Sequence, residues 1–292
     1  MYTFKTNKFP KNTVEIIVDI KSATIQNEYN TSFLKLLQNL QVEGFRKGKV
    51  PKTIAEKHIK KETVYQELVK TLLPRILAEI IKKESLKPII SPKVELVKAK
   101  ELEDWQIKIT LAEKPKVDLG DYKEVLKKVK AEQKKADIWV PGKQSQKKEP
   151  TDKEKSEIQQ RTLNTILSAV IKTTKCEIAD LIIEEELNHR LSNLLSDIQK
   201  IGLTAETYLK SKNLTQEELK KRYRDEIEQT YKLEFILAEV ADRENIKVGQ
   251  SDLEKLFSNI SDPKEREEAR ANSYFYASVL RKQKTLDYLL TL

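Results

Sequence analysis

The chain has 292 residues, of which 38% are hydrophobic and 35% are charged, and it contains only six glycines. This length allows two or more domains, and this composition favours long, exposed helices over one compact globule. Its single cysteine excludes an internal disulfide, so we expect a reducing compartment.

The basic excess, 55 Lys and Arg against 46 Asp and Glu, is uneven along the chain. Residues 1–113 carry 21 basic and 14 acidic side chains, and residues 127–155 carry ten lysines and five acids. Such a distribution suits a partner covered in phosphates, although a solvated basic surface without a partner is the alternative. Because no apolar stretch is long enough for a membrane span or a secretion signal, we expect a cytoplasmic protein with no membrane partner.

Residues 1–115 combine strand and helix patterns. Residues 13–20, 94–98 and 105–112 are rich in β-branched or alternating apolar residues and predict three strands. Helical spacing predicts helices within 25–40, from Pro51 to about Ile59, and from Glu62 to Glu84. We therefore expect an α+β domain of one strand, three helices and two strands.

The rest of the chain divides into two segments. Residues 116–154 are weakly helical at first and then aperiodic and rich in lysine, which predicts a linker. Residues 155–292 carry apolar residues at helical spacing throughout and predict an all-α domain of at least five helices. Thr215 to Glu218 and Ser251 to Glu254 are predicted capping boxes.

A cationic loop with one aromatic residue lies between two of the predicted helices. Glycines that permit positive φ flank it, and a proline ends it, so its central side chains should project outward. A guanidinium and an ammonium bind phosphate or carboxylate, and a phenyl ring can enter an apolar cleft. An ordinary helix-to-helix turn is the alternative. The candidate binding residues are Gly44, Phe45, Arg46, Lys47, Gly48, Lys49 and Pro51.

Groups that support catalysis or metal binding are scarce in this sequence. His58 and His189 are far apart, Cys176 has no cysteine partner at metal-binding spacing, and no glycine-rich phosphate loop is present. We predict no catalytic residue, no metal site and no cofactor.

The segment from Gly44 to Pro51 resembles the ribosome-docking signature of the bacterial trigger factor family. The resemblance covers residues 1–126 and about 155–292, and it includes the stretches at 72–74, 105–119, 182–187 and 280–290. It implies that Phe45, Arg46 and Lys47 form the docking triplet. The implied partner is the large ribosomal subunit, through its protein and RNA surface beside the nascent-chain exit.

The resemblance also implies an ATP-independent chaperone whose C-terminal helices form arms around nascent or unfolded polypeptides, and it allows a homodimer away from the ribosome. A nucleic-acid-binding protein that uses the basic N-terminal and linker surface is the alternative. The candidate client-binding residues are Leu256, Phe257, Ile260, Tyr274, Phe275, Tyr276, Val279 and Leu280.

One departure from the family pattern concerns enzymatic activity. Trigger factors usually carry an FKBP-like prolyl isomerase domain of roughly 90–100 residues between the two matched parts. Here only residues 127–154 lie between them, and such a short, lysine-rich segment cannot bury an independent core. We therefore expect a form without the isomerase domain and without enzymatic activity.

Overall fold

The computed structural model describes residues 2–136 and 152–292. The chain divides into two compact units, and each is described by itself below. The first unit comprises residues 1–114 with 179–182, and the second comprises residues 115–178 with 183–292. None of the described helices combines the length and the hydropathy needed to cross a lipid bilayer.

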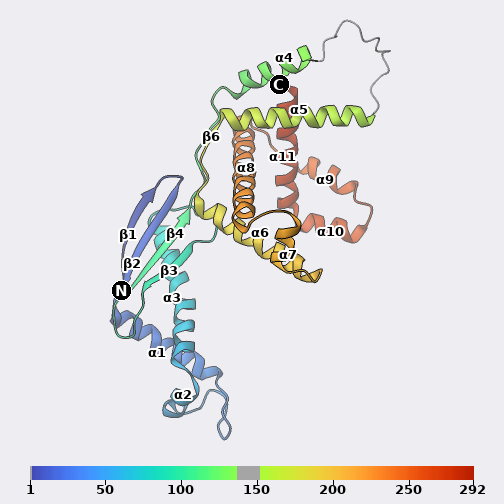
Figure 1. Cartoon of the computed structure of the whole chain (residues 1–292). Helices are drawn as coiled ribbons and strands as arrows, with labels where there is room; N and C mark the ends of the chain where they lie inside the picture. The colour runs from blue at the N-terminus through green and yellow to red at the C-terminus, as the bar shows by residue number, and fades with distance from the viewer. Residues whose placement is uncertain (1, 137–151) are drawn as a thin grey trace. The chain divides into compact units, whose positions relative to one another are not determined.

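An antiparallel sheet of four strands forms one layer of the first unit (Figure 1). The strands are β1 (Tyr2–Phe9), β2 (Thr13–Ile20), β3 (Lys93–Lys98) and β4 (Trp105–Ala112), in the order β1-β2-β4-β3. Every second residue of the two central strands is buried, as period-two patterns require. Ile16 pairs with Ile109 and Val18 pairs with Ile107, so the same face of both strands is apolar.

Three helices follow β2, namely α1 (Ser22–Asn39), α2 (Lys52–His58) and α3 (Lys61–Lys83). Leu68, Leu72, Ile76 and Ile80 recur every four residues along α3 and pack in one core with the inward residues of the sheet. This spacing places them on one face of the helix. The α+β character of this region is therefore confirmed, and α3 runs through Pro74.

The prediction of three strands was incomplete, because β1 is a fourth. Its residues Tyr2, Phe4 and Thr6 are half-buried and alternate with exposed ones. A tight hairpin turn joins β1 to β2, and Lys11 and Asn12 take positive φ angles of 58° and 51° there. An edge strand of this kind buries little of its surface, so its sequence carries only a weak apolar pattern.

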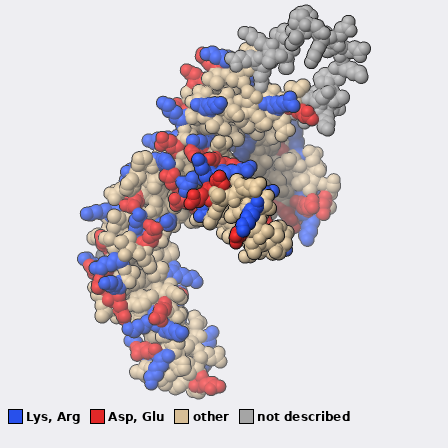
Figure 2. Space-filling model, viewed as in Figure 1, with Lys and Arg blue, Asp and Glu red and all other residues tan. Residues whose placement is uncertain are grey.

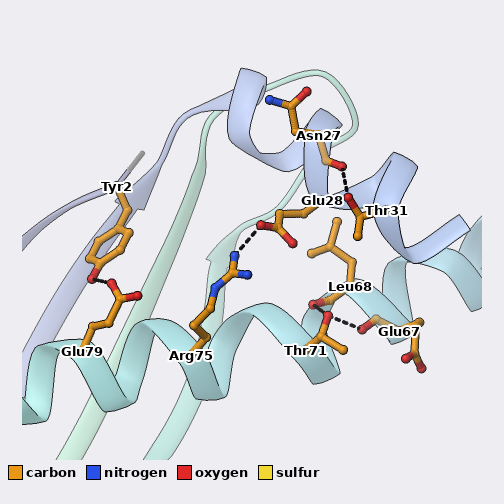
Figure 3. A network of polar contacts seen from close by, with 9 residues as sticks. All are labelled: Tyr2, Asn27, Glu28, Thr31, Glu67, Leu68, Thr71, Arg75 and Glu79. Atoms are coloured by element: carbon orange, nitrogen blue, oxygen red, sulfur yellow. Dashed lines mark hydrogen bonds and ion pairs between the residues drawn. The ribbon is translucent and has the colours of Figure 1, made fainter. Parts of the chain in front are cut away.

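Polar contacts attach β1 and α1 to α3 (Figure 3). The Tyr2 hydroxyl donates to Glu79 Oε2 at 2.6 Å, and this hydrogen bond to a carboxylate raises the pKa of Tyr2 to about 12. Arg75 of α3 donates to Glu28 of α1. These side chains come from three elements, so the two contacts connect β1 and α1 to the same helix.

The second unit is almost entirely helical. Helices α5 (Asp152–Thr173), α8 (Gln216–Arg243) and α11 (Ser273–Thr291) pack against one another, and α4 (Tyr122–Ala136) packs along α5 (Figure 1). Helices α9 (Gln250–Ser258) and α10 (Pro263–Ala271) pack against α11. The unit also contains α6 (Asp180–Lys200) from residue 183 onward, α7 (Ala205–Ser211), and a two-residue ladder of β5 (Val117–Asp118) with β6 (Lys175–Cys176). The ladder is an exception to the all-helical expectation.

The segment predicted as a linker, 116–154, is not uniform. Leu119, Tyr122 and Leu126 are buried, so the start of this segment belongs to the helical unit. Helix α5 already begins at Asp152, and the part of the prediction that falls on 137–151 lies outside the described residues.

The two predicted capping boxes had different outcomes. At the start of α8 the Thr215 hydroxyl accepts from the Glu218 amide at 3.2 Å, and the Glu218 carboxylate accepts from the Thr215 amide at 2.8 Å, as predicted. The box predicted at Ser251 was wrong. Helix α9 begins at Gln250, and the Asp252 carboxylate accepts from the Gly249 amide at 2.9 Å, which satisfies the helix end two residues earlier.

Candidate functional site

The loop between α1 and α2 is closed by backbone hydrogen bonds. The Gly48 amide donates to the Leu40 carbonyl at 3.2 Å, and the Lys49 amide donates to the Arg46 carbonyl at 2.9 Å. Gly44 and Gly48 take φ angles of +85° and +75°. Residues that carry a Cβ atom rarely adopt such positive φ angles. Pro51 is the N-cap of α2, so the loop ends where the sequence predicts.

The side chains of this loop project into solvent, while its end is anchored in a small core. Phe45 is 38% exposed, and Arg46, Lys47 and Lys49 are all exposed. Val50, by contrast, is buried in a cluster with Phe33, Ala55, Ile59 and Val64. The loop therefore presents its aromatic and cationic side chains from a packed base.

The cations of the loop lack acidic partners. Within the part of the chain that the structure describes, Arg46, Lys47 and Lys49 form no salt bridge. Several other lysines of the same unit lie within salt-bridge distance of carboxylates, although among the described residues Lys70 and some others do not, and the paired ones are Lys21, Lys35, Lys61, Lys93, Lys98 and Lys108. The unpaired positive charge of the loop is therefore available to an external anion.

The two glycines of the loop should respond differently to alanine. A Cβ at residue 48 would lie 2.9 Å from the Gln38 carbonyl oxygen, whereas a Cβ at residue 44 would meet nothing within 4 Å. Gly44→Ala should therefore cost only about 1 kcal/mol of backbone strain, and Gly48→Ala about 1–2 kcal/mol more because the helix end must move. Hydrogen exchange of the α1–α2 amides measures the difference. Equal protection in the two variants would contradict it.

The candidate client-binding residues of α9 and α11 have mixed exposure. Tyr274, Phe275 and Val279 are 90%, 62% and 48% exposed, respectively. The half-buried members of the set are Leu256, Ile260, Tyr276 and Leu280.

The prediction for Phe257 is wrong. Its side chain is only 2% exposed, so it cannot line an accessible surface. The Phe257 ring packs edge-on against Tyr276 with centroids 5.6 Å apart, which places it inside the contact of α9 with α11. The helical period of α9 indicates which residues share a face. Only the tertiary packing decides which of these residues are buried in the contact with α11.

Sequence reasoning missed a polar cluster around Glu244, where three elements of the helical unit meet. Its carboxylate accepts hydrogen bonds from Tyr122 at 2.8 Å and Tyr288 at 2.7 Å, and it pairs with Lys123 at 2.7 Å. The hydrogen bonds from Lys123, Tyr288 and Tyr122 lower the pKa of Glu244 to about 2. Tyr122 and Lys123 are neighbours, but Glu244 and Tyr288 lie far from them and from each other in the sequence, so no local pattern signals this cluster.

The depressed pKa predicts acid sensitivity of the helical unit. The ordinary pKa is 4.5, so the contribution of Glu244 is complete above that pH and is lost as the pH falls toward 2. Glu244→Gln should lower the free energy of unfolding by about 1–3 kcal/mol at pH 7 and flatten its decline between pH 5 and pH 2. Urea unfolding followed by circular dichroism measures this change. Glu206→Gln, which removes an exposed pair with Lys210, should leave both quantities nearly unchanged.

The residues considered for catalysis lie apart. His58 and His189 are exposed and belong to different units, and burial raises the pKa of the Cys176 thiol, which disfavours the reactive thiolate. The described residues include no cluster of His, Cys, Asp and Glu that could hold a metal ion.

Two family models match almost the whole chain. The model of bacterial trigger factor protein matches residues 2–139, and the model of the trigger factor C-terminus matches residues 143–290. The chain belongs to the bacterial trigger factor family. Only residues 140–142 separate the two matches, and no FKBP domain model matches, as expected for a form without that domain.

Individual trigger factors resemble parts of the chain. The trigger factor of Halalkalibacterium halodurans is 34% identical over 121 residues, covering 41% of this chain and 28% of that protein. Those of Streptococcus pneumoniae (strain Hungary19A-6) and Lactococcus lactis subsp. cremoris are 30% and 26% identical over 164 and 181 residues, covering 56% and 62% of this chain. These matches cover 35% of the Streptococcus pneumoniae protein and 38% of the Lactococcus lactis protein. The matches to these relatives thus span less than two fifths of their length.

A solved structure shares the fold. It is described as showing promiscuous substrate recognition in folding and assembly activities of the trigger factor chaperone. It matches with a TM-score of 0.62 at 16% sequence identity and covers 99% of each chain. The arrangement of a strand-rich N-terminal region followed by a mostly helical part is therefore that of a trigger factor.

Proposed function

We propose that this chain is an ATP-independent, ribosome-associated chaperone. It docks on the large ribosomal subunit near the nascent-chain exit through the α1–α2 loop, and its helical unit shields nascent or unfolded polypeptides. The observation that carries the proposal is the loop itself, in which an exposed Phe45 lies beside three cations without salt bridges. Phosphates of ribosomal RNA and an apolar cleft of a ribosomal protein would complement it.

The exposed aromatic residues of α11 support the chaperone part of the proposal. Tyr274 and Phe275 expose most of their surface, which is costly in water unless a partner covers it intermittently. Weak contacts of this kind accept many sequences. The trigger factor whose structure shares this fold is described as recognising substrates promiscuously.

The proposed function does not include prolyl isomerisation. The two family matches are almost contiguous, so no segment of domain length lies between them to provide an isomerase fold. A standard assay with a proline-containing peptide should give the uncatalysed rate.

Binding to ribosomes at several salt concentrations tests the proposal. The full chain should co-sediment with large ribosomal subunits at about 50–200 mM salt more strongly than with naked ribosomal RNA. It should also suppress the aggregation of an unfolded reference protein without ATP. Equal binding to naked RNA without such suppression would favour the nucleic-acid-binding alternative. Against that alternative, Figure 2 shows basic and acidic side chains interspersed over the visible face of the N-terminal unit, at lower left.

A further inference from the structure

The two edges of the N-terminal sheet differ in how they are covered. Strands β1 and β3 form opposite edges, and no described strand pairs with the outer side of either (Figure 1). The β1 edge borders a cleft of about 1040 Å³ that contains the Tyr2–Glu79 hydrogen bond and the Arg75–Glu28 ion pair (Figure 3). Polar side chains from α1 and α3 thus line the space beside β1.

The β3 edge instead borders an apolar hollow of about 550 Å³ between β3 and α3. Its apolar walls are Tyr65, Val69, Leu96, Ala99 and the Trp105 ring. The Trp105 indole nitrogen donates to the Lys100 carbonyl at 3.0 Å, and the side chain is only 4% exposed, so Trp105 forms part of the closed base of the hollow.

Strand β3 exposes apolar side chains as well as a free backbone edge. Val94, Leu96 and Val97 are 37%, 49% and 58% exposed. The regular ladder with β4 runs from Lys93 to Leu96, and the register shifts between Leu96 and Lys98. Between Lys93 and Leu96, the backbone amide and carbonyl groups that face away from β4 need a partner with both acceptors and donors. An extended polypeptide provides both.

Two charged residues of opposite sign lie at the rim of the hollow. Glu62 and Lys70 belong to α3, and neither forms a salt bridge within the described residues. Glu62 and Lys70 are eight positions apart along α3, which corresponds to a rise of about 12 Å along the helix axis. An extended strand covers this distance in about three to four residues. Glu101, also at the rim, is paired with Lys61 at 2.8 Å and is therefore less available.

The direction of β3 relative to these charges follows from its register. Lys98 pairs with Gln106, next to Trp105, and the Trp105 ring lies 5.8 Å from the Tyr65 ring. Tyr65 lies one helical turn after Glu62 near the start of α3. The C-terminal end of β3 is therefore the end that lies toward Glu62. A strand added antiparallel to β3 would begin near Glu62 and proceed toward Lys70.

We propose that the outer edge of β3 and the adjoining hollow bind an extended segment of unfolded polypeptide as an antiparallel strand. An apolar side chain of the segment fills the hollow, a basic side chain two residues earlier faces Glu62, and an acidic side chain two residues later faces Lys70. All three side chains share one face because strand residues alternate. This site is separate from the docking loop and from the exposed aromatic residues of α11, and it goes beyond the proposed function.

Fluorescence anisotropy with labelled peptides tests the proposal on the full chain. The probe is Ser-Lys-Thr-Leu-Thr-Glu-Ser, and its charge-reversed form exchanges the Lys and the Glu. Leu96→Glu should weaken binding of the probe at least about tenfold, because a carboxylate would be desolvated in the hollow. The matched control Leu34→Glu changes a leucine of similar exposure, 52% against 49%, and should leave binding unchanged. Circular dichroism confirms that both variants are folded.

The charged rim gives a second, independent readout. The charge-reversed peptide should bind the unaltered chain about fivefold more weakly, and Glu62→Lys with Lys70→Glu should restore its affinity. A photoreactive group in place of the leucine of the probe should crosslink to residues of β3 or α3. Unchanged binding by Leu96→Glu, stronger binding of the reversed peptide, or crosslinks confined to 183–292 would overturn the proposal.

Two further measurements separate this proposal from its alternatives. Leu96→Glu should leave co-sedimentation with ribosomes unchanged, so a failure of the β3 site and a failure of the docking proposal are distinguishable. Sedimentation velocity tests a second copy of the chain as the occupant. If Leu96→Glu dissociates a dimer while probe binding stays the same, the edge serves self-association and the proposal is wrong.

Discussion

Replacing Phe45, Arg46 and Lys47 together by alanine should lower the affinity of the chain for large ribosomal subunits at least about 100-fold. A charge-assisted hydrogen bond contributes about 1.5–3 kcal/mol, and full burial of a phenyl ring contributes a similar amount. A 100-fold loss corresponds to only about 2.7 kcal/mol, so the expectation holds even if the three contributions are far from additive. The loss of two cations should also reduce the salt dependence of binding by about two units of slope.

The fold should survive this triple replacement. All three side chains are exposed, and the loop is anchored by Val50 and by the Gly48–Leu40 hydrogen bond, which the variant retains. Co-sedimentation at several salt concentrations measures the affinity, and circular dichroism checks the helices. Lys5, Lys8 and Phe9 of β1 provide a matched control, because they are also exposed and their replacement by alanine removes two cations and a phenyl ring. Equal losses in the two variants would show that general charge, and not the loop, attracts the ribosome.

Replacing Tyr274, Phe275 and Val279 together by serine should raise the concentration of chain needed to halve the aggregation of an unfolded protein about fivefold to tenfold. These residues are the exposed members of the candidate client surface. A change of this size corresponds to about 1–1.4 kcal/mol, less than full burial of a single aromatic side chain, as expected for weak and distributed contacts. Light scattering during dilution of a denatured reference protein measures it.

The control for this experiment changes exposed apolar residues elsewhere. Phe9, Leu34 and Ile89 are 50%, 52% and 40% exposed and lie in the other unit. Their replacement by serine should leave the suppression of aggregation nearly unchanged. If the control reduces suppression as much as the α11 variant does, overall surface hydrophobicity and not the α11 surface accounts for the activity. Ribosome binding should be normal in both variants, which separates this prediction from the first.

Local pattern predicted the first unit well where one face of an element is buried. The alternation in β2 and β4 and the four-residue spacing in α3 correspond to residues of the observed core. The glycines at 44 and 48 also indicated the loop, since both adopt positive φ. Strand β1 was missed because it lies at an edge, where one half-buried face leaves only a weak pattern.

The start of α9 shows a limit of short motifs. Ser251 and Glu254 match the capping-box pattern, yet the helix begins after Gly249 with Asp252 as the reciprocal acceptor. Gly249 has no side chain to complete a box, so only the Asp252 half of the motif is present. A four-residue pattern therefore indicated a helix start within two residues of the observed one but not its exact position.

The sequence by itself determined most of the order of the elements, the glycine-bounded cationic loop and the short spacing between the two segments that match the family. These features depend on residues that are neighbours along the chain. Only the tertiary structure decided that Phe257 is buried while Phe275 is exposed, that Glu244 meets Tyr122 and Tyr288, and that the outer edge of β3 adjoins an apolar hollow. The physical reason is that periodicity indicates which face of an element is apolar, whereas the partner that covers that face comes from a distant part of the chain.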